Sequence, residues 1–142
     1  MNLLVIHGPN LNLLGTRDPK TYGSMKLEDL NSYITSEFPE HHISFFQSNV
    51  EGELINRLHE ALTDGTEAVV ANMGGYTHTS VALRDALEPL KCPKVEVHMS
   101  NIHAREEFRE HSITGQVMDG IITGFGAQSY ILGIKAIERS IK

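Results

Sequence analysis

Arg17 and Tyr22 stand close together in the segment that follows the first apolar run of the chain. A tyrosine has an unperturbed pKa of about 10, so it is seldom ionised near neutral pH. An arginine within a few ångströms favours the phenolate and lowers that pKa, by roughly 1–3 units if phenols follow other acids. Because a catalytic base works best with a pKa near the operating pH, the pair indicates proton-transfer chemistry. The alternative is an exposed loop tyrosine beside a solvated arginine.

Glu96 and His98 form a second candidate pair, in the run VEVH at residues 95–98. If this run is a strand, the two side chains point to the same face. A carboxylate next to an imidazole holds its tautomer and favours its protonated form, which suits a general acid. The alternative is a hydrogen-bonded histidine at a strand end, although an unpaired glutamate buried in an apolar strand would be costly.

The glycine-rich run NMGGYTHTS at residues 72–80 is a third candidate. A strand, two glycines and a helix start would present backbone N–H groups to an anion. The fingerprints G-x-G-x-x-G and G-x-x-x-x-G-K-[ST] are absent, which disfavours a dinucleotide or a nucleoside triphosphate. A turn followed by a helix cap explains the run equally well. Ser80 near His78 could be a nucleophile, but G-x-S-x-G is also absent and a helix-start hydroxyl is favoured.

Metal chemistry finds little support among the eight histidines. H-E-x-x-H does not occur, and His41 and His42 have no nearby acidic cluster, so we expect no metal ion. Cys92 is the only cysteine, which excludes an internal disulfide and favours a packing or surface thiol.

The composition of the 142 residues is ordinary for a soluble domain, with 40% hydrophobic and 21% charged residues. A net charge of -6 without a compensating Lys/Arg block disfavours nucleic acid as a partner. Local cationic spots for a small anionic substrate remain at Arg17, Arg84, Arg105 and Arg109. The chain has no apolar run long enough to span a bilayer and no recognisable signal peptide, so we expect a cytoplasmic protein that does not bind membranes.

The elements that must position these residues alternate between strands and helices. Apolar, β-branched runs predict strands at residues 3–6, 43–47, 68–71, 95–98 and 120–123. Amphipathic spacing predicts helices at residues 27–38, 54–62, 79–90 and 127–141, the second with a capping box made by Ser48 and Glu51. This alternation predicts an α/β fold, a flavodoxin-like doubly wound five-stranded parallel sheet in three α/β/α layers. We expect residues 1–142 to form a single catalytic domain.

The predicted fold has a consequence for function. In open α/β sheets, ligands bind beyond the carboxyl ends of the strands, near the switch in strand order. Polar residues gather after the first, third and fourth predicted strands, among them Asn10, Arg17, Tyr22, Asn72, His78, His98, Ser100, Arg105 and Arg109. The topology therefore predicts a site at this edge of the sheet.

Four stretches of the chain closely resemble the type II 3-dehydroquinate dehydratases: GPNLNLLGTR at 8–17, QSNVEGEL at 47–54, YTHTSVALRDA at 76–86 and EVHMSNIHARE at 96–106. The resemblance covers essentially the whole chain, in order. It implies a homo-oligomer, a dodecamer built from trimers. It also implies the reversible anti elimination of water from 3-dehydroquinate to 3-dehydroshikimate through an enolate, without metal, organic cofactor or lysine imine.

The resemblance further implies a role for each catalytic position. Tyr22 is the base that takes a proton from C2 of the substrate, and Arg17 stabilises the tyrosinate. His98 is the acid that protonates the departing C1 hydroxyl, and Glu96 holds its ring. Asn10 supports the enolate through a water.

The substrate contacts implied by the resemblance are Asn72, His78, Met99, Ser100, Arg109 and, from a neighbouring subunit, Asp85. Backbone N–H groups of Met99 and Ser100 would hold the carboxylate. Where the family usually reads Asn-Pro-Gly-Ala-Tyr, this chain has Met73 and Gly75, so we expect Asn72 to be less firmly positioned. We expect residues 15–22 to form a lid that excludes water.

A different class of function stays open, a non-catalytic flavodoxin-like module that binds a small molecule or a flavin. Loss of Arg17, Tyr22 or His98 would be its sign, and none of them is lost. For a dehydratase, the same residues would serve aromatic amino-acid biosynthesis by the shikimate pathway and quinate breakdown.

Overall fold

The computed structural model describes residues 1–16 and 24–140. Its strands form a five-stranded parallel sheet in the order β2-β1-β3-β4-β5. The strands are β1 (Asn2–His7), β2 (His42–Gln47), β3 (Ala68–Asn72), β4 (Lys94–His98) and β5 (Gly120–Thr123). This order is that of the doubly wound flavodoxin-like sheets, which confirms the predicted fold class.

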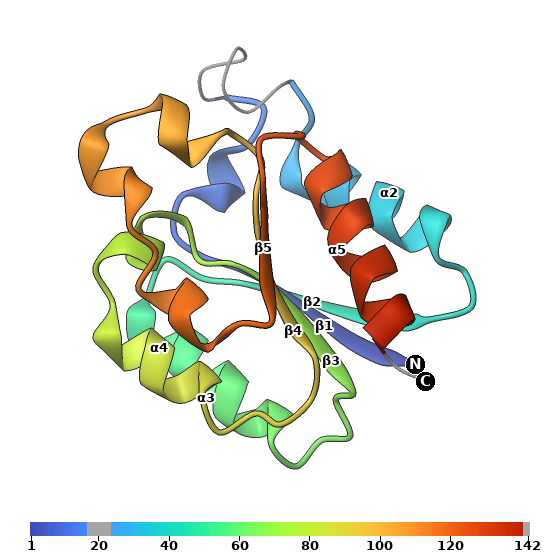
Figure 1. Ribbon diagram of the computed structural model, residues 1–142. Coiled ribbons are helices and arrows are strands. Elements are labelled where there is room, and N and C mark those ends of the chain that lie inside the picture. Colours follow the sequence, from blue (N-terminus) through green and yellow to red (C-terminus); the bar gives the residue numbers. More distant parts are fainter. Residues whose placement is uncertain (17–23, 141–142) are drawn as a thin grey trace.

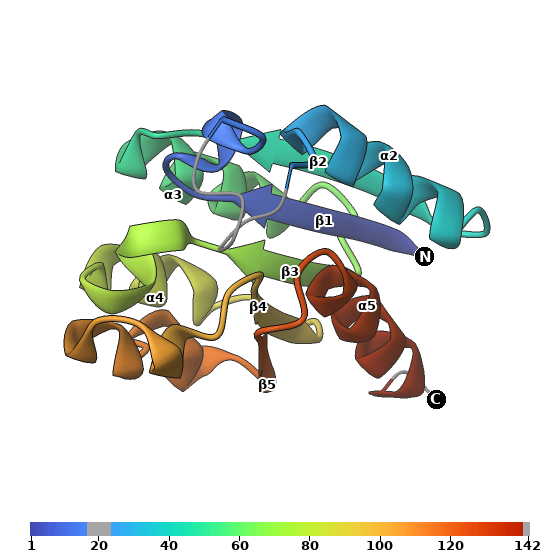
Figure 2. The ribbon, with the colours of Figure 1, turned by 90° about the horizontal axis from the view of Figure 1, so that it is seen from above.

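Helices cover both faces of the sheet, so the molecule has three layers (Figures 1 and 2). The helices α2 (Leu27–Glu37) and α5 (Gln128–Ser140) lie on one face, and α3 (Glu51–Ala61) and α4 (Val81–Leu87) lie on the other. Among the described helices, none combines the length and the apolar character that crossing a membrane requires.

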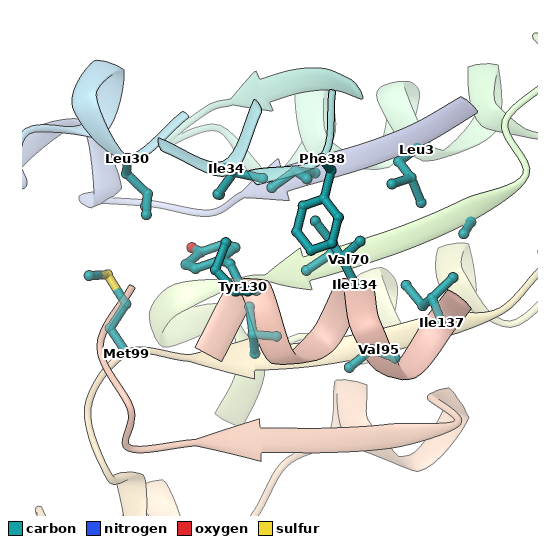
Figure 3. Close-up of a cluster of buried hydrophobic side chains, with 14 of the residues drawn as sticks. Leu3, Leu30, Ile34, Phe38, Val70, Val95, Met99, Tyr130, Ile134 and Ile137 are labelled. Carbon is teal, nitrogen blue, oxygen red and sulfur yellow. The ribbon is translucent and has the colours of Figure 1, made fainter. Parts of the chain in front are cut away.

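The strand β1, which lies between β2 and β3, is a continuous apolar run because both of its faces are covered. Leu3 and Val5 pack toward α2 and α5, whereas Leu4 and Ile6 pack toward α3 and α4. Alternate residues of a strand face opposite sides, and here both sides are buried. Figure 3 shows the hydrophobic cluster on the face of the sheet that α2 and α5 cover, where side chains of the two helices meet.

Short 3₁₀ helices carry the chain away from the carboxyl ends of three strands. The helix η1 (Leu11–Leu13) follows β1, η2 (Gly74–His78) follows β3, and η3 (Ile102–Ala104) follows β4. Two more, η4 (Glu107–Glu110) and η5 (Thr114–Val117), lead from η3 to β5. These connections, rather than the strands themselves, supply most of the polar groups at this edge.

The helix predicted at residues 79–90 is shorter than expected and spans Val81–Leu87. Ser80 is extended, with ψ of 98°, and its hydroxyl accepts a hydrogen bond from the N–H of Leu83 at 2.9 Å. Ser80 is therefore the N-cap residue of α4, which agrees with the prediction that its hydroxyl lies at a helix start. The helix ends before Pro89, which has no N–H to continue it.

The capping box predicted for α3 is wrong. Ser48 precedes the cap residue Val50 and accepts its N–H at 2.9 Å, while the Ser48 hydroxyl donates to Glu53. The carboxylate of Glu51 instead accepts the Ser80 hydroxyl of the neighbouring helix start. Local sequence spacing could not reveal this tertiary partner.

Candidate active site

A cavity opens at the carboxyl edge of the sheet, where β1, β3 and β4 end. Its lining comes from three connections: Pro9, Asn10 and Leu11 after β1; Asn72, Gly74, Gly75 and His78 at β3; and His98, Met99, Ser100, Ile102, Arg105 and Arg109 at β4. Because β2 lies on the far side of β1, the strand order switches between β1 and β3. The cavity thus occupies the position that open α/β sheets use for ligands.

Most of the residues singled out in the sequence meet at this cavity. It is lined by Asn10, Asn72, His78, His98, Met99, Ser100 and Arg109. Glu96 lies behind His98. Asp85 does not line the cavity; it lies on α4 and pairs with Arg84 at 3.0 Å. Arg17, Tyr22 and most of the expected lid lie outside the described residues.

His98 and Glu96 form a buried pair on one face of β4. The Nε2–H of His98 donates to Oε2 of Glu96 at 2.9 Å. Only 1% of the Glu96 side chain is exposed. Burial alone would raise the pKa of this carboxyl, but hydrogen bonding and the charge of His98, with two hydroxyl donors, hold it below its ordinary value. Nδ1 of His98 is left without a hydrogen-bond partner among the described residues.

Ser112 and Thr114 supply those two hydroxyl donors, and the sequence reasoning missed both. The Ser112 hydroxyl donates to Oε2 of Glu96 at 2.8 Å, and the Thr114 hydroxyl donates to Oε1. Together with His98 they give both carboxylate oxygens a hydrogen-bond donor, which is how a charge survives at this depth. Neither residue belongs to a local motif, because the contacts are made by the connection between η4 and β5 folding back over β4.

His78 faces His98 across the cavity, and the two rings stack with centroids 6.3 Å apart. Its Nδ1 lies 2.8 Å from the carbonyl oxygen of His111, so Nδ1 carries the proton and donates. Burial, and then the nearby charges of His98 and Arg109, lower the pKa of His78 despite that hydrogen bond. His78 is therefore neutral near pH 7, with Nε2 as an acceptor.

Asn10 adopts the left-handed conformation, with φ of 70°. Its N–H donates to Oδ1 of Asn49 at 2.8 Å, so the loop after β2 holds this turn in place. Asparagine tolerates such a backbone better than most residues, and positions of this kind cluster at functional sites.

Asn72 is restrained at both ends of its amide. Its Nδ2 donates to the hydroxyl of Tyr130 at 2.9 Å, and its Oδ1 accepts the N–H of Gly74 at 3.2 Å. Met73 is 1% exposed and packs into the core between the sheet and α3 and α4. The structure therefore does not support the expectation that Met73 and Gly75 leave Asn72 loosely held.

Two arginines give the cavity a cationic wall. Arg109 donates from Nε to Glu106 at 2.8 Å, and Arg105 donates from Nη1 to the Ser100 hydroxyl at 3.3 Å. Guanidinium groups suit carboxylate recognition because their N–H donors match its two oxygens. The sequence analysis placed Arg105 among the polar residues at this edge because it lies in the run that follows β4, although the family resemblance gave it no role.

Three side chains of types that can ligate a metal lie together away from this cavity. His41 lies before β2, with Nε2 2.9 Å from Glu138 and 3.7 Å from Glu40. The expectation that His41 lacks acidic neighbours is therefore wrong, because α5 brings Glu138 beside it. Among the described residues this is the one group of three that could hold a metal, and it lies far from the cavity lining.

Comparison with known proteins places these residues in context. The family model described as dehydroquinase class II matches residues 1–138. The chain is 52% identical over 136 residues to a 3-dehydroquinate dehydratase of Saccharophagus degradans, covering 94% of this chain and 93% of that protein. It is 50% identical over 143 residues to the 3-dehydroquinate dehydratase of Trichodesmium erythraeum, covering 99% and 95%.

The structural similarity extends over the same length. The crystal structure of a type II dehydroquinase from Butyrivibrio crossotus superposes with a TM-score of 0.95 at 42% identity, covering 97% of each chain. A 3-dehydroquinate dehydratase-like protein from Bifidobacterium longum is more distant, with a TM-score of 0.72 at 26% identity over 98% of this chain and 96% of that one.

Proposed function

This chain belongs to the dehydroquinase class II family, and we propose that it acts as a 3-dehydroquinate dehydratase. It is then a hydro-lyase that interconverts 3-dehydroquinate and 3-dehydroshikimate with release or uptake of water. One observation carries the proposal beyond family membership. The buried Glu96 fixes His98 through Nε2, and His98 lines the same cavity as Asn10, Ser100 and Arg109.

The acid half of the reaction falls to His98. With Nε2–H engaged by Glu96, only Nδ1 can exchange a proton with a ligand. The ionised Glu96 stabilises the imidazolium before transfer, and the hydroxyls of Ser112 and Thr114 help to keep Glu96 ionised by lowering the pKa of its carboxyl. His98 then protonates the C1 hydroxyl, which leaves as water.

The base half falls to Tyr22, with Arg17 holding it as tyrosinate. Tyr22 removes a proton from C2, and the electrons move to the C3 carbonyl to form an enolate. Asn10, fixed in its left-handed turn, supports that oxygen through a water. Collapse of the enolate expels the C1 hydroxyl on the opposite face, which gives an anti elimination.

Substrate recognition uses the remaining wall of the cavity. Backbone N–H groups of Met99 and Ser100 hold the carboxylate, with Arg109 nearby, while Asn72 and the neutral His78 bind hydroxyls. Asp85 contributes from a neighbouring subunit, because on its own subunit it lies outside the cavity. We accordingly propose a dodecamer built from trimers, acting in the cytoplasm without cofactor.

The direct test replaces the acid and the base. General acid–base groups contribute about 10²–10⁴-fold each, so His98→Ala and Tyr22→Phe should lower kcat by factors in that range. His103→Ala and Tyr33→Phe are matched controls outside the cavity and should keep wild-type kcat. Near-normal turnover of 3-dehydroquinate by either active-site variant would reject the assignment.

A further inference from the structure

Two buried polar side chains and one partly buried one lie behind the cavity and have no part in this chemistry. They are Tyr130 of α5, His7 of β1 and Asn31 of α2, and they lie between the sheet and its two covering helices. Tyr130 and His7 are both 0% exposed. Figure 3 places Tyr130 among the apolar side chains of α2 and α5, where a hydroxyl needs a specific partner.

These side chains form a continuous chain of hydrogen bonds that ends at Asn72. The Tyr130 hydroxyl lies 2.9 Å from Nδ2 of Asn72 and 3.0 Å from Nδ1 of His7. Nε2 of His7 lies 2.9 Å from Oδ1 of Asn31. The chain thus runs from the cavity wall, through β1, to the outer layer of the molecule.

One backbone group sets the direction of every bond in this chain. The N–H of Gly74 can only donate, so the amide atom of Asn72 that faces it at 3.2 Å is the oxygen. Nδ2 therefore faces Tyr130, whose oxygen accepts and whose proton is free to go to Nδ1 of His7. His7 then carries its proton on Nε2 and donates it to Asn31. Gly74 reaches this position with φ of +56°, where a Cβ would lie 2.9 Å from the carbonyl oxygen of Pro9.

We propose that Tyr130, His7 and Asn31 are positioning residues that fix the Asn72 amide with an N–H donor available to the substrate. Asn72 has two hydrogens on Nδ2, and Tyr130 accepts only one of them. The other has no partner among the described residues, and Asn72 lines the cavity. This site therefore selects a substrate oxygen that can accept a hydrogen bond. The inference rests on the proposed function, whose substrate carries such ring hydroxyls.

The charge states of the two buried groups preserve this direction. Burial lowers the pKa of His7 to about 4, although the bond to Asn31 opposes the shift. Burial also raises the pKa of Tyr130 above its ordinary value. Both groups are neutral at neutral pH, so His7 carries one N–H and Tyr130 one O–H. The direction of the hydrogen bonds therefore stays the same.

The first test is Tyr130→Phe, which removes one hydroxyl and keeps the buried ring. Freeing the Asn72 amide loses one neutral hydrogen bond to substrate, so KM should rise about 3- to 10-fold. Because that bond exists in both ground state and transition state, kcat should change little. Tyr33→Phe, whose hydroxyl contacts Gln128 outside the cavity, is the matched control and should keep the wild-type KM.

A double-mutant cycle with Asn72→Ala separates positioning from general damage to the fold. If Tyr130 acts through Asn72, then Tyr130→Phe should not raise KM further in the Asn72→Ala background. Additive effects on KM would overturn the proposal. Asn31→Asp, which presents only acceptors to His7, should keep the wild-type KM, whereas Asn31→Leu should raise it. If both Asn31 variants raised KM equally, Asn31 would have to donate to His7, and the hydrogen bonds of the chain would run in the opposite direction. That result would also overturn the proposal.

Failure of the proposed function gives a different result. A wild-type protein without turnover would reject the dehydratase assignment, and the cycle would then be run on the dissociation constant of 3-dehydroquinate from calorimetry. A measurable constant that follows the same cycle supports the positioning chain, and no binding by the wild type overturns it.

Discussion

At the scale of single residues, His98 and Glu96 behave as one unit. The carboxylate is buried and accepts hydrogen bonds from His98, Ser112 and Thr114, so its charge depends on all three donors. Glu96→Gln keeps the shape but removes the charge that favours the imidazolium. We expect kcat to fall by about tenfold or more, a part of the 10²–10⁴ that a general acid contributes.

The matched control for this change is Glu53→Gln. Glu53 also accepts a serine hydroxyl, that of Ser48, but it lies on α3 away from the cavity. Steady-state kinetics should show a wild-type kcat for this variant. If Glu96→Gln were equally active, the pairing would be structural and the acid would have to be another group.

His7 gives a prediction for the dependence of stability on pH. Its pKa falls from 6.5 in the unfolded chain to about 4 in the buried site. The unfolded state therefore takes up the proton first, so stability is fully present above pH 6.5 and is lost as the pH falls toward 4. At about 1.4 kcal/mol per pKa unit, the loss is about 3 kcal/mol.

Urea unfolding at a fixed protein concentration measures this loss. His7→Gln has no group that titrates in the window, so the wild-type free energy of unfolding should fall more steeply than that of the variant between pH 6.5 and 4. Parallel pH curves for the two proteins would show that His7 is protonated in the folded state.

The sequence allowed us to predict pairs of side chains whose contact follows from the repeat of the strand. It did not allow us to predict pairs that meet only through tertiary folding. The period of two in a strand was enough to place Glu96 and His98 together. Ser112 and Thr114 reach Glu96 only because the connection before β5 folds over β4. Glu138 reaches His41 because the packing of α5 brings it there from the far end of the chain, which local spacing also does not reveal.

At the scale of elements, the strands were predictable because they are continuous apolar runs, whereas a strand with one exposed face would alternate apolar and polar residues. Residues 120–123 were predicted with the observed bounds. The predicted bounds of β2, β3 and β4 differ from the observed ones by one residue at one end, and those of β1 by one residue at each end. The helix after β3 was predicted too long, because its amphipathic pattern continues through Thr79 and past Pro89 while the backbone does not. The boundary is set by Ser80, whose cap and contact with Glu51 are tertiary features.

Gly8 links two of these elements and yields a prediction for the fold. It follows β1, donates to the carbonyl of Asn72 at 2.7 Å, and would carry a Cβ 2.3 Å from the carbonyl oxygen of Met73. The atoms that this Cβ would meet all belong to the backbone of Met73, which cannot move away as a flexible side chain could, so Gly8→Ala should lower the free energy of unfolding by about 1–3 kcal/mol or more. Urea midpoints at fixed protein concentration measure the loss.

Gly52 provides the control for that experiment. It lies in α3, where a Cβ would meet nothing within 4 Å. Alanine favours the helix over glycine, so Gly52→Ala should raise the free energy of unfolding by up to about 1 kcal/mol. A Gly8→Ala protein as stable as the wild type would contradict the close approach of β1 and β3 at the cavity.

At the scale of the whole molecule, the proposed oligomer would complete the site with a residue from a second chain. Asp85 lies on α4, outside the cavity of its own subunit, and the proposed oligomer brings it to the cavity of another. Two inactive variants should therefore complement each other when their subunits are mixed and refolded. His98→Ala supplies an intact Asp85, and Asp85→Ala supplies an intact His98.

Activity recovered only in the mixture would support a site shared between subunits. Each variant refolded alone is the control, and the mass of the assembly is measured by light scattering in every sample. Mixed oligomers that remain as inactive as the separate variants would place the action of Asp85 within its own subunit.

The measurement that tests the central claim most directly is turnover of 3-dehydroquinate by the wild-type protein, followed by the ultraviolet absorbance of the conjugated product. It is run untreated, after a chelator, and after borohydride in the presence of substrate. We expect the same rate in all three, because the proposed mechanism gives the proton transfers to Tyr22 and His98 and needs neither a metal nor a lysine imine. Loss of activity after either treatment would contradict this chemistry, and a folded protein without turnover would favour the binding module.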